Sequence, residues 1–184
     1  MKKTSQIWAP TNLDVGTFRN GDLIPEAITA GEWEEAGVKQ NPVWCYFNND
    51  PANYAKYGKL YNWYAVNDPR GLAPAGWHIP SDHEWTLFIN NLGGKDLAGK
   101  KMKSTSGWNN RGNGDNSSGF AGLPGGFRAY NGKYLNAGDF GYWWSFTEYN
   151  PFSSWYHILY CSYNFVYRDF YFKGYGMSVR CLKD

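Results

Sequence analysis

The chain has 184 residues, with 18 basic and 16 acidic side chains and a formal net charge of +2. Its length is that of one domain, so we expect a single domain over residues 1–184. The near-neutral balance argues against a nucleic-acid-binding protein, the lack of a long apolar run argues against membrane insertion, and an aromatic content of 20% excludes a disordered chain.

The first half of the chain predicts two helices among loops and short strands. Residues 7–20 are typical of a short strand and a turn, and residues 25–42 of a loop with at most one helical turn. The apolar run at 43–47 predicts a strand. A stripe of apolar residues predicts the first helix over 52–66, although Gly58 weakens its start.

The second helix has the clearest local signal. Ser81 and Glu84 form the pattern of a capping box, in which each side chain accepts a hydrogen bond from the backbone N–H of the other residue. Apolar residues then recur at helical spacing at Trp85, Phe88, Ile89 and Leu92, before Gly93 and Gly94. We therefore expect a helix from 82 to 92.

The second half of the chain predicts strands. Residues 104–118 are typical of a long polar loop, and residues 119–128 of a glycine-rich twisted strand. Short aromatic runs between Gly or Asn turns then predict strands at 127–131, 133–136, 142–146, 155–161, 165–172 and 177–182. Helices followed by strands in this way indicate an α+β fold with antiparallel, twisted strands.

Established catalytic and phosphate-binding motifs do not occur in the chain. His78 and His83 flank a proline and a helix start, which is not the spacing of a helical metal pair. The polar loop offers oxygen ligands for calcium at Asn113, Asp115 and Asn116, but only one of these is a carboxylate. We therefore expect no cofactor and no metal, with structural roles for these residues, and leave calcium in the loop open.

Three cysteines, Cys45, Cys161 and Cys181, are too few for a disulfide scaffold. Cys45 and Cys181 lie in apolar strand contexts, where a buried, unreactive thiol is the commoner case. The sequence leaves open whether these two residues form a disulfide. Two lysines near the N-terminus are not followed by an apolar run, so we expect no signal peptide in this chain.

The last quarter of the chain is unusually aromatic. Between Trp143 and Tyr175 there are 15 aromatic residues in 33 positions. Each buries roughly 150–250 Å² when packed, so the core of a small domain cannot hold them all. Either the segment forms a very aromatic core, or part of it is an exposed patch that binds a partner. Its mixture of Tyr, Ser, Asn and Gly is that of antibody binding sites, which favours the patch.

The same segment has a second compositional oddity. Residues 157–172 lack Lys, Glu, Gln, Met and Trp, the five amino acids that a codon ending in a pyrimidine cannot encode. These types make up 33 of the 184 residues, so their chance absence from a stretch of this length has a probability of about 4% against whole-chain composition.

Five sequence blocks occur in a characteristic order. They are LYNWYAV at 60–66, GWHIPSDHEW at 76–85, LPGGFR at 123–128, GYWWSFTE at 141–148 and GMSVRCLKD at 176–184. Together they resemble the Fibrobacter succinogenes major paralogous domain family, in matching order from about Ile7 to the C-terminus.

This resemblance implies a C-type lectin-like fold, in the branch related to formylglycine-generating enzymes, with the N- and C-terminal strands paired. The family also includes variable proteins of diversity-generating retroelements, in which adenines of a template repeat are mutated during reverse transcription. The implied variable, ligand-binding region of this chain is 146–175.

The resemblance also implies which residues vary and which do not. The implied ligand-binding, diversified residues are Phe146, Tyr149, Phe152, His157, Ile158, Tyr160, Cys161, Tyr163, Phe165, Tyr167, Asp169, Phe170, Phe172 and Tyr175. The implied invariant frame between them is Trp155, Leu159, Val166, Arg168 and Lys173.

We therefore expect a binding module and not an enzyme, displayed on a virion or cell surface, with a protein or other macromolecule as its partner. The calcium-binding triplets of sugar-binding C-type lectins, Glu-Pro-Asn and Gln-Pro-Asp, do not occur. Ala73 stands where many members carry a cysteine, which removes one disulfide partner. The alternatives are an oxidase of the formylglycine-generating type and a structural component that packs through its aromatic face. The oligomeric state stays open.

Overall fold

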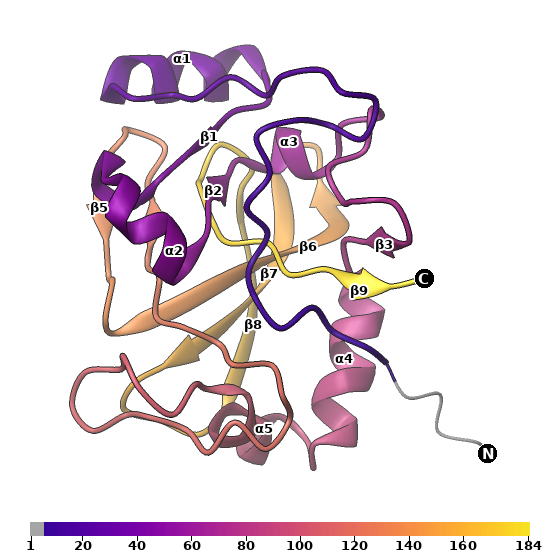
Figure 1. Cartoon of the computed structure of the whole chain (residues 1–184), viewed down its shortest axis with the longest axis vertical. Helices are drawn as coiled ribbons and strands as arrows, with labels where there is room; N and C mark the ends of the chain where they lie inside the picture. Colours follow the sequence, from indigo (N-terminus) through magenta and orange to yellow (C-terminus); the bar gives the residue numbers. More distant parts are fainter. Residues whose placement is uncertain (1–5) are drawn as a thin grey trace.

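A three-stranded antiparallel sheet forms the centre of the chain in the computed structural model, which describes residues 6–184 (Figure 1). In chain order the elements are α1 (Ala30–Lys39), β1 (Trp44–Cys45), η1 (Phe47–Asn49), η2 (Pro51–Asn53), α2 (Tyr54–Tyr57), β2 (Leu60–Tyr61), α3 (Trp63–Val66), β3 (Trp77–His78), α4 (Asp82–Asn91), α5 (Lys95–Met102), β4 (Phe127–Arg128), β5 (Tyr134–Leu135), β6 (Phe140–Asn150), β7 (Ser153–Tyr160), β8 (Val166–Phe172) and β9 (Leu182–Lys183). The helices precede the long strands, so the expected mixed architecture with open antiparallel sheets is confirmed.

The helix predicted over 82–92 is confirmed as α4. Its capping box is complete: the Glu84 N–H donates to Ser81 Oγ at 3.3 Å, and the Ser81 N–H donates to Glu84 Oε2 at 2.8 Å. The predicted polar loop at 104–118 is also confirmed. Residues 127–184, all of which the structure describes, contain strands and turns without a helix, as expected.

The other helix predictions are wrong in part. The prediction of one helix over 52–66 fails because the backbone turns at Gly58, where φ is +72°, and continues as β2. The predicted loop at 25–42 contains the ten-residue helix α1. Helix α5 follows α4 directly and was not predicted, so three helices of eight or more residues lie in the described chain rather than two.

Two strand predictions are also too long. The glycine-rich stretch 119–128 is mostly irregular, and only its last two residues form β4. In the same way, the strand predicted at 177–182 reduces to isolated bridges and β9. The chain ends nevertheless pair as expected, because the Ala9 N–H donates to the Cys181 carbonyl and the Lys183 N–H donates to the Ile7 carbonyl, both at 2.9 Å.

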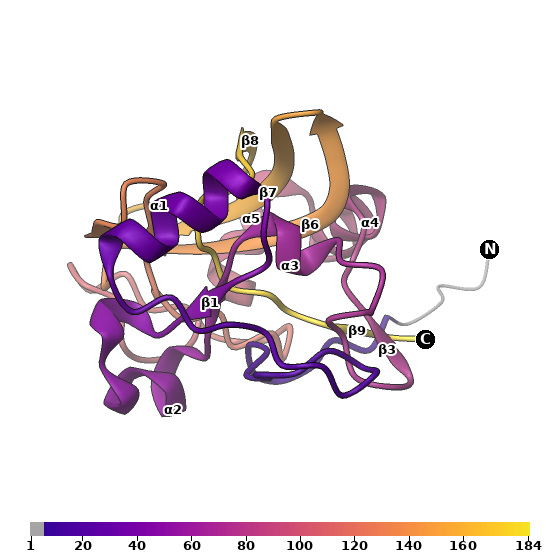
Figure 2. The same ribbon diagram turned by 90° about the horizontal axis from the view of Figure 1, so that it is seen from above.

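The main sheet has the order β6–β7–β8, with β8 at an edge. One face packs Trp143, Leu159 and Val166 against α4 and α5. The other packs Tyr142, Trp144 and Tyr156 against the first part of the chain and residues 175–181. In Figure 2 the β6–β7 hairpin projects to the edge of the molecule opposite α2. Since α4 and α5 pack on one face and the first part of the chain packs on the other, both faces of the sheet are covered near β6.

Tryptophan indoles join this sheet to the rest of the fold. The Trp144 Nε1 donates to the Tyr61 carbonyl at 2.9 Å, and the Trp63 Nε1 donates to the Ser145 carbonyl at 2.9 Å. These side chains are almost fully buried. Each therefore adds a satisfied buried hydrogen bond to the large apolar area of its rings, which holds β6 in a fixed position.

Candidate functional site

The edge strand β8 is exposed on both of its faces. Residues 167–171 are five consecutive exposed residues, and three of them are aromatic. Tyr167 and Tyr171 are 42% and 43% exposed on one face, and Phe170 is 38% exposed on the other. A strand of a globular domain normally buries one face, so this strand leaves apolar area in water that the core does not use.

Half of the predicted ligand-binding residues are exposed. These are Phe146, Tyr149, Phe152, Tyr163, Tyr167, Asp169 and Phe170. Four others, Ile158, Tyr160, Phe165 and Phe172, are half-buried. Tyr171 was not predicted, although its alternation with Asp169 along β8 was a usable signal. These exposed rings lie along the edge of the main sheet, on both sides of β8. We call the rings of Tyr149, Phe152, Tyr163, Tyr167, Phe170 and Tyr171 together the aromatic face.

The expected exposure is wrong for His157, Cys161 and Tyr175, which are all buried. The ring of His157 stacks on Trp85 of α4, with centroids 4.7 Å apart. Cys161 belongs to the core cluster beneath α4 and α5. Tyr175 packs on Phe127 with ring centroids 5.6 Å apart. The sheet face that carries His157 is covered by a helix, which the strand pattern alone does not reveal.

Phe146 is exposed but lies apart from the aromatic face. It lines a hollow of about 450 Å³ together with Leu72, His78 and Glu84. Its backbone N–H donates to the Pro80 carbonyl at 2.9 Å, so this end of β6 is held beside the start of α4.

Several rings of the aromatic face pack against neighbouring rings. Tyr149 and Phe170 stack with their centroids 3.8 Å apart, and the edge of Trp155 meets both. A second series runs through the β7–β8 turn, where Tyr163 stacks on Phe165 at 4.9 Å. Pairs of this kind gain about 0.5–1.5 kcal/mol beyond their buried area, which favours defined positions for Tyr149, Tyr163 and Phe170.

The predicted frame residues are mostly buried. Leu159, Val166 and Lys173 are between 1% and 4% exposed, whereas Trp155 is half-buried. The Lys173 Nζ donates to Glu148 Oε2 at 2.7 Å and to the Pro151 carbonyl at 2.9 Å, which closes the β6–β7 turn. Arg168 alone among the five is exposed.

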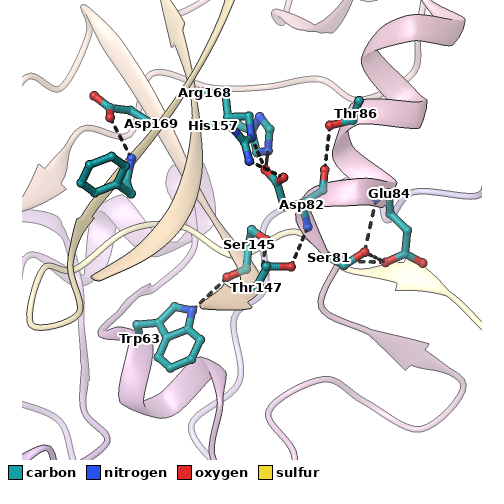
Figure 3. A network of polar contacts seen from close by, with 11 residues as sticks. Trp63, Ser81, Asp82, Glu84, Thr86, Ser145, Thr147, His157, Arg168 and Asp169 are labelled. Atoms are coloured by element: carbon teal, nitrogen blue, oxygen red, sulfur yellow. Dashed lines mark hydrogen bonds and ion pairs between the residues drawn. The ribbon is translucent and has the colours of Figure 1, made fainter. Parts of the chain in front are cut away.

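Arg168 is nevertheless tightly held (Figure 3). Its Nε and Nη2 donate to the two carboxylate oxygens of Asp82, each at 2.7 Å. Its guanidinium lies over the ring of Trp155, 3.4 Å from the centroid. The Asp82 N–H donates to Thr147 Oγ1 at 3.0 Å, so Asp82 joins α4 to both β6 and β8.

Asp82 is ionised at neutral pH. Burial by itself would raise the pKa of Asp82, but its contacts with His157 and Arg168 lower that pKa to about 2. His157 Nε2 lies 3.4 Å from Asp82 Oδ1. Burial lowers the pKa of His157, against the opposing effect of Asp82, so the imidazole is neutral. The ring of His157 therefore packs against Trp85 as a neutral side chain beside the ionised Asp82.

The other polar candidates have structural partners. Asn113 Oδ1 accepts from the Trp108 N–H, Asp115 Oδ1 from the Ser117 N–H, and Asn116 Oδ1 from the Ala121 N–H. These oxygens therefore hold the polar loop together. Within residues 6–184 no group of three or more His, Cys, Asp or Glu side chains is arranged to hold a metal ion.

The three cysteines are free and buried. Burial raises the pKa of Cys45 to about 11 and that of Cys181 to about 12. Both thiols are therefore protonated at neutral pH, and a protonated thiol is a weak nucleophile. The pairing of Cys45 with Cys181 that the sequence left open does not occur.

Two hollows border the edge strand. One, of about 560 Å³, lies between α4, α5 and β8. The other, of about 580 Å³, lies between α1 and β8, and we call it the α1–β8 groove. It is lined by Glu34, Gly37, Val38, Tyr130, Ser153, Phe170, Tyr171, Phe172 and Tyr175.

The comparison with protein families agrees with the sequence blocks. The model of the Fibrobacter succinogenes major domain matches residues 1–183. The chain belongs to this family. No curated protein and no solved structure matches it. Among the helices of residues 6–184, none has the length and apolar character needed to cross a bilayer.

Proposed function

We propose that this member of the Fibrobacter succinogenes major domain family is a ligand-binding module that holds a macromolecular target, a protein or a cell-surface component, on its aromatic face. The observation that carries the proposal is the edge strand β8, which exposes rings on both of its faces. Exposed apolar patches of this kind mark interaction sites. Tyr and Phe side chains that lose water on contact supply much of the binding energy at such surfaces.

The proposed fold is that of C-type lectins, in the branch related to formylglycine-generating enzymes. It is supported by the paired chain ends, by helices that precede the main sheet, and by the position of the aromatic face on the last three long strands. In the arrangement that we propose, the framework stays constant while the surface of the sheet carries the ligand.

We also propose that a retroelement diversifies the exposed positions of the region 146–175. The stretch 157–172, which lacks the residues that pyrimidine-ending codons cannot encode, includes the whole of β8. Exchange of an exposed side chain usually changes the free energy of unfolding by about 0.5 kcal/mol or less. The buried positions His157, Cys161 and Tyr175 do not share this tolerance, so the proposed diversified set is narrower than the resemblance implies.

The chemistry of the thiols supports a binder over an oxidase. An oxidase of the formylglycine-generating type needs a reactive thiol, and burial keeps Cys45 and Cys181 protonated. Assembly through β8 with a further subunit is the other alternative, because an edge strand has unpaired backbone groups. Sedimentation at increasing protein concentration separates this alternative from a monomeric binder.

The test compares two sets of exposed apolar residues. One variant replaces Phe152, Tyr163, Tyr167 and Phe170 by serine. The control replaces Leu23, Ile28, Leu87 and Leu97, which are exposed elsewhere, by serine. Both variants should unfold close to the temperature of the parent chain. Only the first should lose capture of proteins from a cell-envelope fraction.

Two results count against the proposal. Equal loss of capture in both variants would show that binding is nonspecific, and a large loss of stability in the first alone would show that its rings belong to the core. The proposal of diversification is tested in the neighbouring DNA. It requires a near-copy of the codons for 146–181, with adenines at the variable positions, beside a reverse transcriptase gene. If no such copy exists, the proposal of diversification is wrong. The proposal of ligand binding would then be tested by the two variants alone.

A further inference from the structure

The α1–β8 groove has walls from two parts of the chain. Helix α1 and Tyr130 lie outside the region 146–175, whereas Tyr171, Phe172 and Tyr175 lie inside it. The groove holds about 580 Å³, which is the size of a small-ligand site. One side of the groove therefore lies outside the proposed variable region, and the opposite side lies within it.

The aromatic walls of the groove meet at right angles. The rings of Tyr171 and Tyr175 are 4.3 Å apart at 85°, and those of Tyr130 and Phe172 are 6.4 Å apart at 84°. Tyr130 also approaches Tyr175, at 5.9 Å and 52°. Of these rings Tyr130 and Tyr171 are exposed, at 49% and 43%, and the π face of an aromatic ring carries partial negative charge. Burial raises the pKa of Tyr175, so its phenol stays neutral.

The charge around the groove is negative. Among the described residues that line it, Glu34 is the one acidic residue, and it is exposed on α1. Asp169 precedes Tyr171 by two residues, so both side chains lie on the same face of β8. Aromatic faces together with a carboxylate are the chemistry that binds an organic cation.

The walls are held in place without a ligand. The Trp33 Nε1 on α1 donates to the Gly174 carbonyl at 3.0 Å, and Trp33 is 1% exposed. A methyl group at Gly37 would lie 3.6 Å from the Cα of Gly174, so the helix and the chain after β8 are in close contact. A site that needs no rearrangement loses little binding energy to ordering.

We propose that the α1–β8 groove is a cation-binding subsite that takes the lysine side chain of a partner protein. This inference rests on the proposed function, because the lysine would belong to the protein that the aromatic face binds. An ammonium group has three N–H donors for Glu34 and Ser153, and its aliphatic stem fits the exposed side chain of Val38. A quaternary ammonium, which has no N–H donor, satisfies the aromatic walls but not the polar groups.

The test titrates the full chain with three small probes at low salt. Nα-acetyl-lysine N-methylamide carries the cation, Nα-acetyl-norleucine N-methylamide is its neutral counterpart, and choline is the quaternary ammonium. The NMR signals of Val38, Tyr130 and Tyr171 should shift with the lysine probe, and its affinity should exceed that of the norleucine probe by about fivefold or more. Equal affinity for lysine and norleucine, or tighter binding of choline than of lysine, would overturn the inference.

Variants locate the subsite and separate it from the wider proposal. Glu34→Gln and Tyr171→Ser should each weaken the lysine probe by about threefold to fivefold. Tyr167→Ser removes an equally exposed ring from the same face of β8 outside the groove and should leave the probe unchanged. If only the Tyr167 variant lost binding of the lysine probe, the probe would bind outside the α1–β8 groove and the inference would be wrong. Since no target is needed, probe binding without target capture rejects only the proposed function, and capture without probe binding rejects only the subsite.

Discussion

The carboxylate of Asp82 joins α4 to the exposed strand β8, and Asp82→Asn tests how this strand is held. The variant keeps the shape of the side chain but removes the charge that pairs with Arg168. The pKa of Asp82 falls from 3.8 to about 2, and since one pKa unit corresponds to 1.36 kcal/mol, the stabilisation has a ceiling of about 2.5 kcal/mol. Arg168 is 43% exposed, so solvent screening reduces the expected loss to about 1–2 kcal/mol.

The loss should depend on pH in a known direction. The pKa of Asp82 is lower in the folded chain than in the unfolded chain, so its stabilisation is complete above about pH 4 and disappears as the pH falls toward 2. Urea unfolding at pH 7 should show the full difference between parent and variant. At pH 2.5 the difference should fall to less than half.

A double-mutant cycle assigns the effect to the pair. Asp82→Asn, Arg168→Gln and the double variant should give a coupling free energy of about 1 kcal/mol. Asp169→Asn is the control, because its carboxylate points to the opposite side of β8 from Arg168 and accepts from its neighbour's backbone N–H (Figure 3). Zero coupling, or a loss for Asp82→Asn that is the same at pH 7 and pH 2.5, would refute this account of the network.

Two further substitutions test the support beneath the β7–β8 turn. Gly99→Ala would place a methyl group 2.5 Å from the Asn164 carbonyl oxygen, so urea unfolding should show a loss of about 1–3 kcal/mol even though alanine favours the helix by about 1 kcal/mol. An equal or higher stability would mean that α5 does not press on the turn. Lys103→Met removes a buried Nζ that donates to two carbonyls of the turn, which should cost about 1–3 kcal/mol and speed amide exchange at 161–165. Lys100→Met, on the exposed side of α5, should do neither.

Local signals identified the helices only where glycine did not interrupt them. The Ser81 capping box predicted α4, and Thr29 with Glu32 forms the same box at the start of α1. After this second box Gly31 and Gly37 interrupt the helical pattern, so the local sequence of 25–42 is typical of a loop. At Gly37 helix α1 lies against the chain after β8, a contact between distant segments that the local sequence does not contain.

The candidate site was predictable in composition and not in exposure. The aromatic excess located the region, which includes the exposed strand β8. Which face is covered depends on α4, and the ring of His157 lies beneath Trp85 of that helix. A period of two residues fixes which side chains share a face, but the helix that packs on that face is chosen by the tertiary fold.

The edge strand β8 exposes aromatic rings that could bind a partner, yet it must avoid pairing with other chains through its free edge. An exposed apolar edge invites pairing with other chains, and proteins limit this with charged residues on the edge strand. In β8 the charged residues Arg168 and Asp169 lie between the exposed rings. Arg168 also makes the ion pair with Asp82 and covers Trp155, so its replacement would disturb both the framework and the strand. Among the exposed residues of β8 it is therefore the one that the proposed diversification should leave unchanged, although its exposure alone would place it with the variable positions.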